Sequence, residues 1–178
     1  MSVSTQARAF QVIVLGGLLG LALYFPYLWF GVTPFASDKE YSDAEIAALQ
    51  QGVELPDYYA MPLPERTAAE LAKQKEDFTW CRFCHTLEQG GHNRVGPNLN
   101  RIFGQPAAVV DHFDYSDAFV EKARAEQWVW TPENMAAFIA DPHVVFPGNR
   151  MRYPPMLGYE MSAERDSNII EYLLRETR

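Results

Sequence analysis

The chain has 178 residues, of which 48% are hydrophobic, and this length allows one domain of ordinary size plus an appendage. Its 15 basic and 23 acidic side chains give a formal net charge of -8, and no stretch of the chain forms a basic stripe. These features exclude a nucleic-acid partner, because a protein that binds the phosphate backbone carries clustered Lys and Arg.

The first element is an apolar run at residues 9–30. It holds 22 consecutive residues without a charged side chain, and a membrane-spanning helix needs about 20. Arg8 precedes the run and acidic residues follow it, so the positive-inside rule places the N-terminus in the cytoplasm. A cleaved signal peptide is the alternative, but its apolar region would be shorter. We expect residues 1–31 to form an uncleaved, single-pass anchor whose residues 9–30 contact lipid.

Residues 32–64 have the composition of a tether. They contain six acidic residues, one lysine and four prolines. Ser42 and Glu45 form a capping box, which predicts one short helix within the segment. A flexible coil would let the domain that follows swing between neighbouring proteins on one membrane face. Alternatively, the aromatic and apolar residues at 55–63 dock the segment onto a neighbour or onto that domain.

The remainder, residues 65–178, reads as one helical domain. Capping residues followed by apolar residues at helical spacing predict four helices, which begin at Thr67, Ser116, Thr131 and Ser162. The first helix is expected to run into Trp80 and to pack on the last one through Leu71, Phe78, Ile170 and Tyr172 or Leu173. No alternating strand pattern competes, so the predicted fold class is all-α.

Both cysteines of the chain lie in the sequence Cys81-Arg82-Phe83-Cys84-His85. This spacing attaches a c-type haem through two thioethers and supplies one axial nitrogen from the histidine. A disulfide across two residues would stabilise little, and a zinc site would lack its second pair of ligands. A redox dithiol would need a surrounding βαβ pattern, which is absent. The pattern therefore predicts one covalent haem c, with His85 as an iron ligand.

The second axial ligand must come from the loops that follow. A haem that only carries electrons usually has Met opposite His, because a thioether favours ferrous iron. Met151 is the predicted ligand, and Met156 and His143 are the alternatives. His92 and His112 are expected to be surface residues.

Four further motifs fall in order and in register with a known family. They are Gly96-Pro97-Asn98-Leu99, Phe113-Asp114-Tyr115-Ser116-Asp117, Trp130-Thr131-Pro132-Glu133 and Pro147-Gly148-Asn149-Arg150-Met151. Together with the Cys-x-x-Cys-His sequence they resemble the class I cytochromes c, over nearly all of residues 65–178.

The resemblance implies roles for individual residues. The carbonyl of Pro97 would accept the axial imidazole N–H, which fixes the ring orientation. Tyr115 and Trp130 would meet the haem propionates, and Tyr153 would lie beside the exposed haem edge. Asn149 is counted with them among the cofactor-binding residues.

Two positions depart from the family pattern. Gln105 replaces an arginine that mitochondrial relatives use near the propionates, and Phe138 replaces a tyrosine near the methionine sulfur. The loss of a cation and a hydroxyl changes the field at the iron, so the reduction potential does not carry over from those relatives.

An anchored single-haem domain of this kind resembles the membrane-bound cytochromes c of the c-y type in alphaproteobacteria. The resemblance implies an inner-membrane protein with a periplasmic haem domain, which passes electrons from a cytochrome bc complex to a haem-copper oxidase or a photosynthetic reaction centre. Four arginines could form a basic rim that steers docking, namely Arg82, Arg94, Arg150 and Arg152. Two alternatives stay open: a fixed haem subunit of a respiratory supercomplex, dehydrogenase or reaction-centre system, and a haem that lacks Met151 and binds gases or reacts with peroxide.

Overall fold

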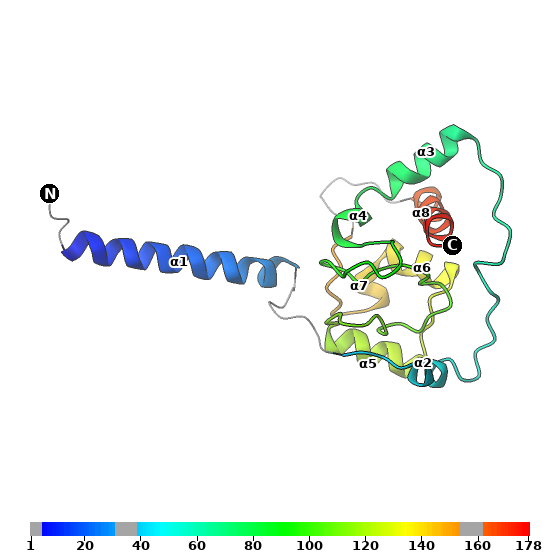
Figure 1. The fold of residues 1–178 in the computed structure, drawn as a ribbon, viewed down its shortest axis with the longest axis horizontal. Helices are drawn as coiled ribbons and strands as arrows, with labels where there is room; N and C mark the ends of the chain where they lie inside the picture. Colours follow the sequence, from blue (N-terminus) through cyan, green and yellow to red (C-terminus); the bar gives the residue numbers. More distant parts are fainter. Residues whose placement is uncertain (1–4, 31–38, 154–161) are drawn as a thin grey trace. The chain divides into compact units, whose positions relative to one another are not determined.

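The computed structural model describes residues 5–30, 39–153 and 162–178 (Figure 1). Contacts within the chain divide it into two units, residues 1–36 and residues 37–178.

The first unit contains one long helix, α1 (Thr5–Phe30), of 26 residues. A helix of that length extends about 39 Å, which exceeds the roughly 30 Å thickness of the hydrocarbon core of a bilayer. Its segment Ala7–Phe25 has a mean hydropathy of 1.7, and none of these 19 residues is buried. By length and composition, α1 can therefore cross a membrane.

The second unit is helical, apart from one isolated β-bridge between Pro106 and Val129 among the described residues. Its helices are α2 (Asp43–Leu49), α3 (Ala68–Asp77), α4 (Cys81–Cys84), α5 (Asp117–Ala125), α6 (Pro132–Ala140), α7 (Pro142–Val145) and α8 (Ala163–Glu176). The predicted all-α class is confirmed.

The helices begin where the sequence predicts. In each of the five longer ones, the N-cap side chain accepts a hydrogen bond from the backbone N–H three residues on, and these caps are Ser42, Thr67, Ser116, Thr131 and Ser162. This bond satisfies one of the N–H groups that a helix start leaves without a partner.

The end predicted for the helix that starts at Thr67 is wrong. α3 stops at Asp77, and a turn closed by the bond from Cys81 N to Phe78 O (3.0 Å) separates it from α4. The physical reason is the complete burial of Phe78, which turns the chain inward before the cysteines.

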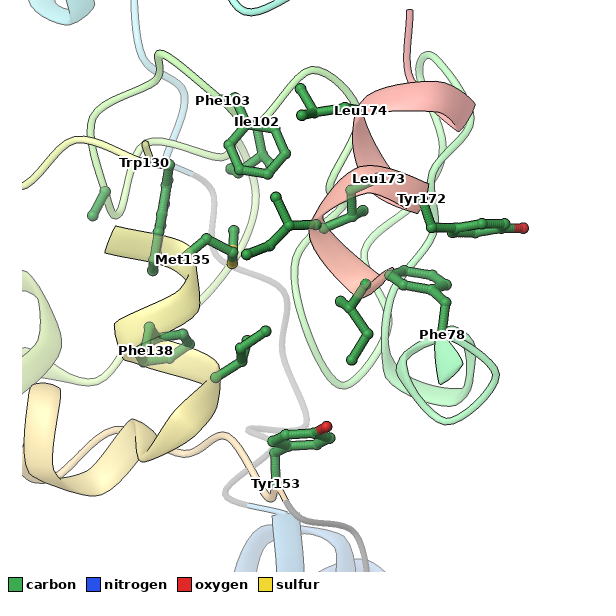
Figure 2. Close-up of a cluster of buried hydrophobic side chains, with 14 of the residues drawn as sticks. Phe78, Ile102, Phe103, Trp130, Met135, Phe138, Tyr153, Tyr172, Leu173 and Leu174 are labelled. Atoms are coloured by element: carbon green, nitrogen blue, oxygen red, sulfur yellow. The ribbon is translucent and has the colours of Figure 1, made fainter. Parts of the chain in front are cut away.

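α3 packs against α8, as predicted, but with a different set of side chains. The rings of Phe78 and Tyr172 stack with centroids 4.9 Å apart, and Figure 2 shows them on facing elements. Leu71 is 41% exposed, so its predicted place in this contact is wrong. The α3 residues that are buried are polar, Gln74 and Asp77. On α8, the predicted partners Ile170 and Leu173 are buried.

Ion pairs close the edges of the α3–α8 contact. Glu171 on α8 accepts hydrogen bonds from Arg66 (2.7 Å) and Arg175 (2.7 Å). The Arg66 guanidinium lowers the pKa of Glu171 to about 2, with the bonds from Gln74 and Arg175 contributing. This carboxylate therefore remains charged far below neutral pH and ties the start of α3 to α8.

An aromatic core fills the space between α5, α6 and α7. Phe146 is fully buried, and its ring stacks on Phe119 with centroids 4.3 Å apart. Trp130 meets Phe138 edge to face at 5.2 Å. Figure 2 shows Trp130, Met135 and Phe138 together on the α6 side of this cluster. These rings supply most of the rigid apolar surface of the unit.

Residues 39–64, here called the strap, lie against the rest of the second unit. Their polar contacts include Tyr41 N to Asp111 Oδ1 (2.7 Å), Gln50 Nε2 to Gly104 O (2.5 Å), Phe103 N to Tyr59 Oη (3.1 Å), and bonds from Arg178 to Met61 O and from Arg175 to Pro64 O. The helix α2 within the strap lies beside α5, where Leu49 and Arg124 line one shallow pocket (Figure 1). Residues 39–64 are therefore docked onto the domain that follows them and do not form a free tether.

Candidate functional site

The two cysteines sit on one short helical turn. α4 spans Cys81–Cys84, and the N–H of His85 donates to Cys81 O at 2.9 Å, so the turn closes directly on the histidine. Neither cysteine forms a disulfide. Burial raises the pKa of the Cys81 thiol to about 12 and also raises the pKa of Cys84. Raised pKa values oppose the thiolate form that a reactive redox dithiol needs.

The imidazole of His85 is held by a backbone carbonyl. Its Nδ1 lies 2.7 Å from Pro97 O, and because a carbonyl only accepts, Nδ1 carries the proton. Burial lowers the pKa of His85, which favours the neutral ring. This tautomer leaves the Nε2 lone pair as the ligating position, the arrangement that metal-bound histidines use.

The loop behind the ring approaches it closely. A Cβ at Gly96 would lie 2.2 Å from His85 Cε1, a distance that no side chain tolerates. The N–H of Gly96 donates to Cys84 O at 2.8 Å, which fixes the loop against the cysteine turn. Only glycine fits here, because the backbone itself forms the wall behind the imidazole.

Side-chain amides and a hydroxyl hold this loop in place. Asn98 Nδ2 donates to Thr86 Oγ1 (2.7 Å) and to Glu88 O (3.0 Å), and Thr86 Oγ1 donates to His92 O (2.8 Å). Asn100 Nδ2 donates to Leu87 O (2.8 Å). Apart from Asn98 as part of a motif, these residues are missed by reasoning from the sequence. The three asparagines between residues 93 and 100 are the signal that could have found them, because Asn side chains stabilise irregular backbone.

Met151, the predicted second ligand, lies in the loop that follows α7. Met151 is half-buried and packs against the hydrophobic core. Its N–H donates to Asn149 Oδ1 at 2.7 Å, and Asn149 Nδ2 donates to Pro142 O (2.6 Å) and Phe146 O (2.7 Å). The buried Asn149 thus connects α7 to Met151.

The alternative ligands have less support. His143 and His92 are exposed, as is His112, whose ring bonds Glu40 at 3.1 Å. The surface placement predicted for His92 and His112 is confirmed. Met156 lies outside the described residues.

The predicted propionate and edge residues belong to the same aromatic core. Trp130 is buried and exchanges backbone hydrogen bonds with Gln105 and Gly104 (2.9 and 2.8 Å). Burial raises the pKa of Tyr115, whose ring stacks on Phe119 at 5.3 Å. Tyr153 is buried as well. The sequence motifs therefore converge on one core.

The residues present fit a covalent haem. The partly buried side chains that pack against the core are apolar, as the environment of a haem ring requires, and they include Cys81, Leu99, Val110, Tyr115, Val120, Ala136, Val145 and Met151. A neutral imidazole and a thioether are soft or borderline ligands that suit iron. Within the described ranges, no group of three or more His, Cys, Asp or Glu side chains could hold another metal ion.

Most of the predicted basic rim is engaged within the molecule. Arg82 donates to the Tyr172 hydroxyl at 2.7 Å, and Arg94 donates to Arg82 O at 2.5 Å. Arg150 pairs with Asp114 at 3.1 Å, whereas Arg152 is exposed. The arginines are therefore partly structural.

No family model matches the chain, but individual relatives do. A protein named cytochrome c2 from Agrobacterium tumefaciens is 37% identical over 105 residues, which cover 59% of this chain and 90% of that protein. A cytochrome c from Kluyveromyces lactis is 30% identical over 116 residues, 65% of this chain and 97% of that protein. The chain belongs to the cytochrome c family.

As a cytochrome c, the chain carries one covalent haem c, attached through Cys81 and Cys84, and it is an electron carrier. A further relative is the cytochrome c-type cyt cy of Rhodobacter capsulatus, 33% identical over 105 residues that cover 59% of this chain. The match spans 47% of that protein, so about half of its length has no counterpart in the comparison. The apolar helix α1 agrees with a membrane-anchored cytochrome of the cy type.

Proposed function

We propose that this cytochrome c is a membrane-tethered one-electron carrier whose iron is held by His85 Nε2 and the Met151 sulfur. The observation that carries the proposal is the 2.7 Å bond from His85 Nδ1 to Pro97 O, because it sets the tautomer that an iron-bound histidine needs. The same bond fixes the ring plane before any ligand binds.

The haem supplies a reversible one-electron couple between ferric and ferrous iron. His85 and Met151 would both bind the iron and leave no position open to a substrate, so the chain is proposed not to be an enzyme. Met151, held by Asn149, would keep small molecules away from the iron. The buried aromatic core excludes water from the same region, which favours the less charged ferrous form.

The remaining site residues have proposed roles around the ring. Tyr115 and Trp130 would meet the propionates, and Tyr153 would border the edge through which electrons pass. Gln105 and Phe138, at the two departing positions, bring neither a cation nor a phenol of their own. The reduction potential is therefore not expected to match that of the mitochondrial relatives.

The proposed topology has residues 1–31 as a single-pass anchor in the inner membrane, with residues 9–30 in lipid. Arg8 stays in the cytoplasm, and the acidic residues from Asp38 onward follow in the periplasm. Completion of the thioether bonds outside the cytoplasm agrees with this orientation. Residues 65–178 form the haem domain, to which the strap adds residues 39–64.

The proposed electron donor is a cytochrome bc complex, and the acceptor is a haem-copper oxidase or a photosynthetic reaction centre. A fixed haem subunit of a supercomplex, dehydrogenase or reaction-centre system is the second candidate. The packing of the strap against its own domain favours it, because residues 39–64 do not add to the reach of a tether.

Native electrophoresis of detergent-extracted membranes with haem staining distinguishes the two candidates. A shuttle migrates as a small haem protein without companion chains. A resident subunit migrates with an oxidase, a bc complex or a dehydrogenase, and the companion chains identify the reaction. A haem domain that lies on the cytoplasmic side of the membrane in intact cells would contradict both candidates.

A further inference from the structure

Both polar groups of the peptide unit between Pro97 and Asn98 form hydrogen bonds. Its carbonyl, Pro97 O, accepts the bond from His85 Nδ1 at 2.7 Å. Its N–H, on Asn98, donates to Asn93 Oδ1 at 2.9 Å. The half-buried Asn93 therefore bonds the same peptide unit that holds the axial imidazole.

Asn93 is itself fixed from the other side. Its Nδ2 donates to Asp111 O at 2.8 Å, and Asp111 Oδ1 accepts from Tyr41 N in the strap at 2.7 Å. The neighbouring His112 N donates to Lys39 O at 2.8 Å. A continuous series of hydrogen bonds thus runs from the strap through Asp111 and Asn93 to the peptide group behind His85.

Hydrogen bonds in such a series strengthen one another. An amide whose N–H donates to an acceptor is polarised, so its carbonyl oxygen becomes more negative and accepts more strongly, by roughly 10–30% per bond in condensed-phase estimates. A stronger acceptor on Nδ1–H makes the imidazole a more basic ligand through Nε2. A more basic ligand stabilises ferric iron relative to ferrous iron and lowers the reduction potential.

We propose that Asn93 is a positioning residue for His85, and that it lowers the reduction potential by polarising the Pro97–Asn98 peptide group. The role rests on the proposed ligation of iron by His85. It assigns a function to a side chain that is outside the recognised motifs and touches neither the haem-binding cysteines nor the histidine.

The test compares Asn93→Ala with Asn100→Ala in the full-length holoprotein. Asn100 is a matched control, because its side chain also bonds a loop carbonyl (Leu87 O, 2.8 Å) but does not touch the Asn98 N–H. We expect Asn93→Ala to shift the equilibrium between the ferric and the ferrous protein about three-fold toward the ferrous form. That change corresponds to an upward shift of about 30 mV for a one-electron couple. Asn100→Ala should shift the midpoint by less than a third of that amount.

A second pair keeps the test decisive if the alanine variant does not fold. Asn93→Asp retains an acceptor for the Asn98 N–H and adds a negative charge, whereas Asn100→Asp adds the same charge without that bond. Asn93→Asp should lower the potential more than Asn100→Asp does. Equal shifts within either pair would overturn the proposal, and so would an upward shift in Asn93→Asp.

Proton NMR separates this role from the ligation on which it rests. Iron-shifted imidazole resonances in the wild-type protein establish His85 as a ligand, and their absence would overturn the ligation itself. If they are present, the His85 Nδ1–H resonance should move in Asn93→Ala and stay in Asn100→Ala. An unmoved resonance in Asn93→Ala would contradict only the role of Asn93.

Discussion

The two loops that would bring ligands to the iron are built differently. The histidine loop, residues 85–100, is held by several side chains, with Thr86, Asn98 and Asn100 donating to the backbone carbonyls of His92, Glu88 and Leu87. In the methionine loop, residues 142–151, the buried Asn149 makes three hydrogen bonds, one of them to the Met151 N–H. Asp141 and Arg150 add side-chain bonds at the two ends of this loop. Several side chains therefore hold the histidine loop, whereas Met151 is tied into its loop by Asn149.

The difference predicts different failure modes. In the histidine loop, loss of one side-chain bond leaves the others in place, so the imidazole should stay bound while its electronic character changes. In the methionine loop, loss of Asn149 should release the ligand. To release His85, a substitution must displace the backbone that packs against its ring.

Gly96→Ala is therefore expected to have the largest effect. Its Cβ would lie 2.2 Å from His85 Cε1 and 2.7 Å from both ring nitrogens, and the ring is held in place by its bond to Pro97 O. We expect a loss of about 3 kcal/mol in the free energy of unfolding or failure to mature the holoprotein. Guanidinium unfolding and the yield of haem-stained protein measure this, with Val95→Ala as the neighbouring control. A Gly96→Ala protein of wild-type stability would refute the close contact.

Asn149→Ala should have the next largest effect and should act on the methionine side alone. It leaves the Met151 N–H without its partner and removes one of the two hydrogen bonds that Pro142 O and Phe146 O each accept, at a cost of about 2–4 kcal/mol. Added imidazole should then displace Met151 at lower concentration, as read by absorption spectroscopy. The contrast is Asn98→Ala, which should destabilise the fold without easing displacement. If imidazole displaced Met151 equally easily in both variants, the proposed difference between the histidine loop and the methionine loop would be refuted.

Glu171→Gln tests the α3–α8 contact through the pH dependence of stability. The pKa of Glu171 is lowered to about 2, chiefly by Arg66, so the stabilising charge is fully present above the ordinary carboxyl pKa near 4.5 and is lost as pH falls toward 2. The variant should therefore unfold at lower denaturant than wild type at pH 7, and the gap should close between pH 5 and pH 2. A gap that is independent of pH would show that the carboxylate charge plays no part.

Asp111→Ala should have the smallest effect, because Asp111 is exposed and loses one bond, to Tyr41 N. We expect less than about 1 kcal/mol of destabilisation, with faster amide exchange at Tyr41 and easier proteolysis within the strap. Glu121→Ala, at another exposed acidic position, is the control. If exchange at Tyr41 is unchanged, the strap is held by its other contacts alone.

The helices and the cysteine-histidine turn could be predicted because their signals are local. Capping side chains such as Thr67 and Thr131 act within three residues, and the spacing of Cys81, Cys84 and His85 follows from one helical turn. Leu71 and the end of α3 were predicted wrongly because they depend on tertiary packing, in which the burial of Phe78 turned the chain and left Leu71 on the surface.

The strap and the asparagine contacts could not be predicted for the same reason. Tyr41 and Asp111 are 70 residues apart in the sequence, and no local pattern pairs them. The acidic residues and prolines of residues 32–64 are typical of linkers, whereas the aromatic and apolar residues at 55–63 favoured docking, so composition left both possibilities open. The bonds from Gln50 to Gly104 O and from Phe103 N to Tyr59 decide for docking from residue 39 onward.

The most direct test of the account is the spin state and ligand access of the haem in Met151→Ala, compared with Met156→Ala. Ligation by Met151 predicts that Met151→Ala is folded but high-spin in the ferric form and binds carbon monoxide readily in the ferrous form. Met156→Ala should remain low-spin and closed to carbon monoxide. A low-spin Met151→Ala together with an open Met156→Ala would contradict the ligand assignment on which the proposed electron carrier rests.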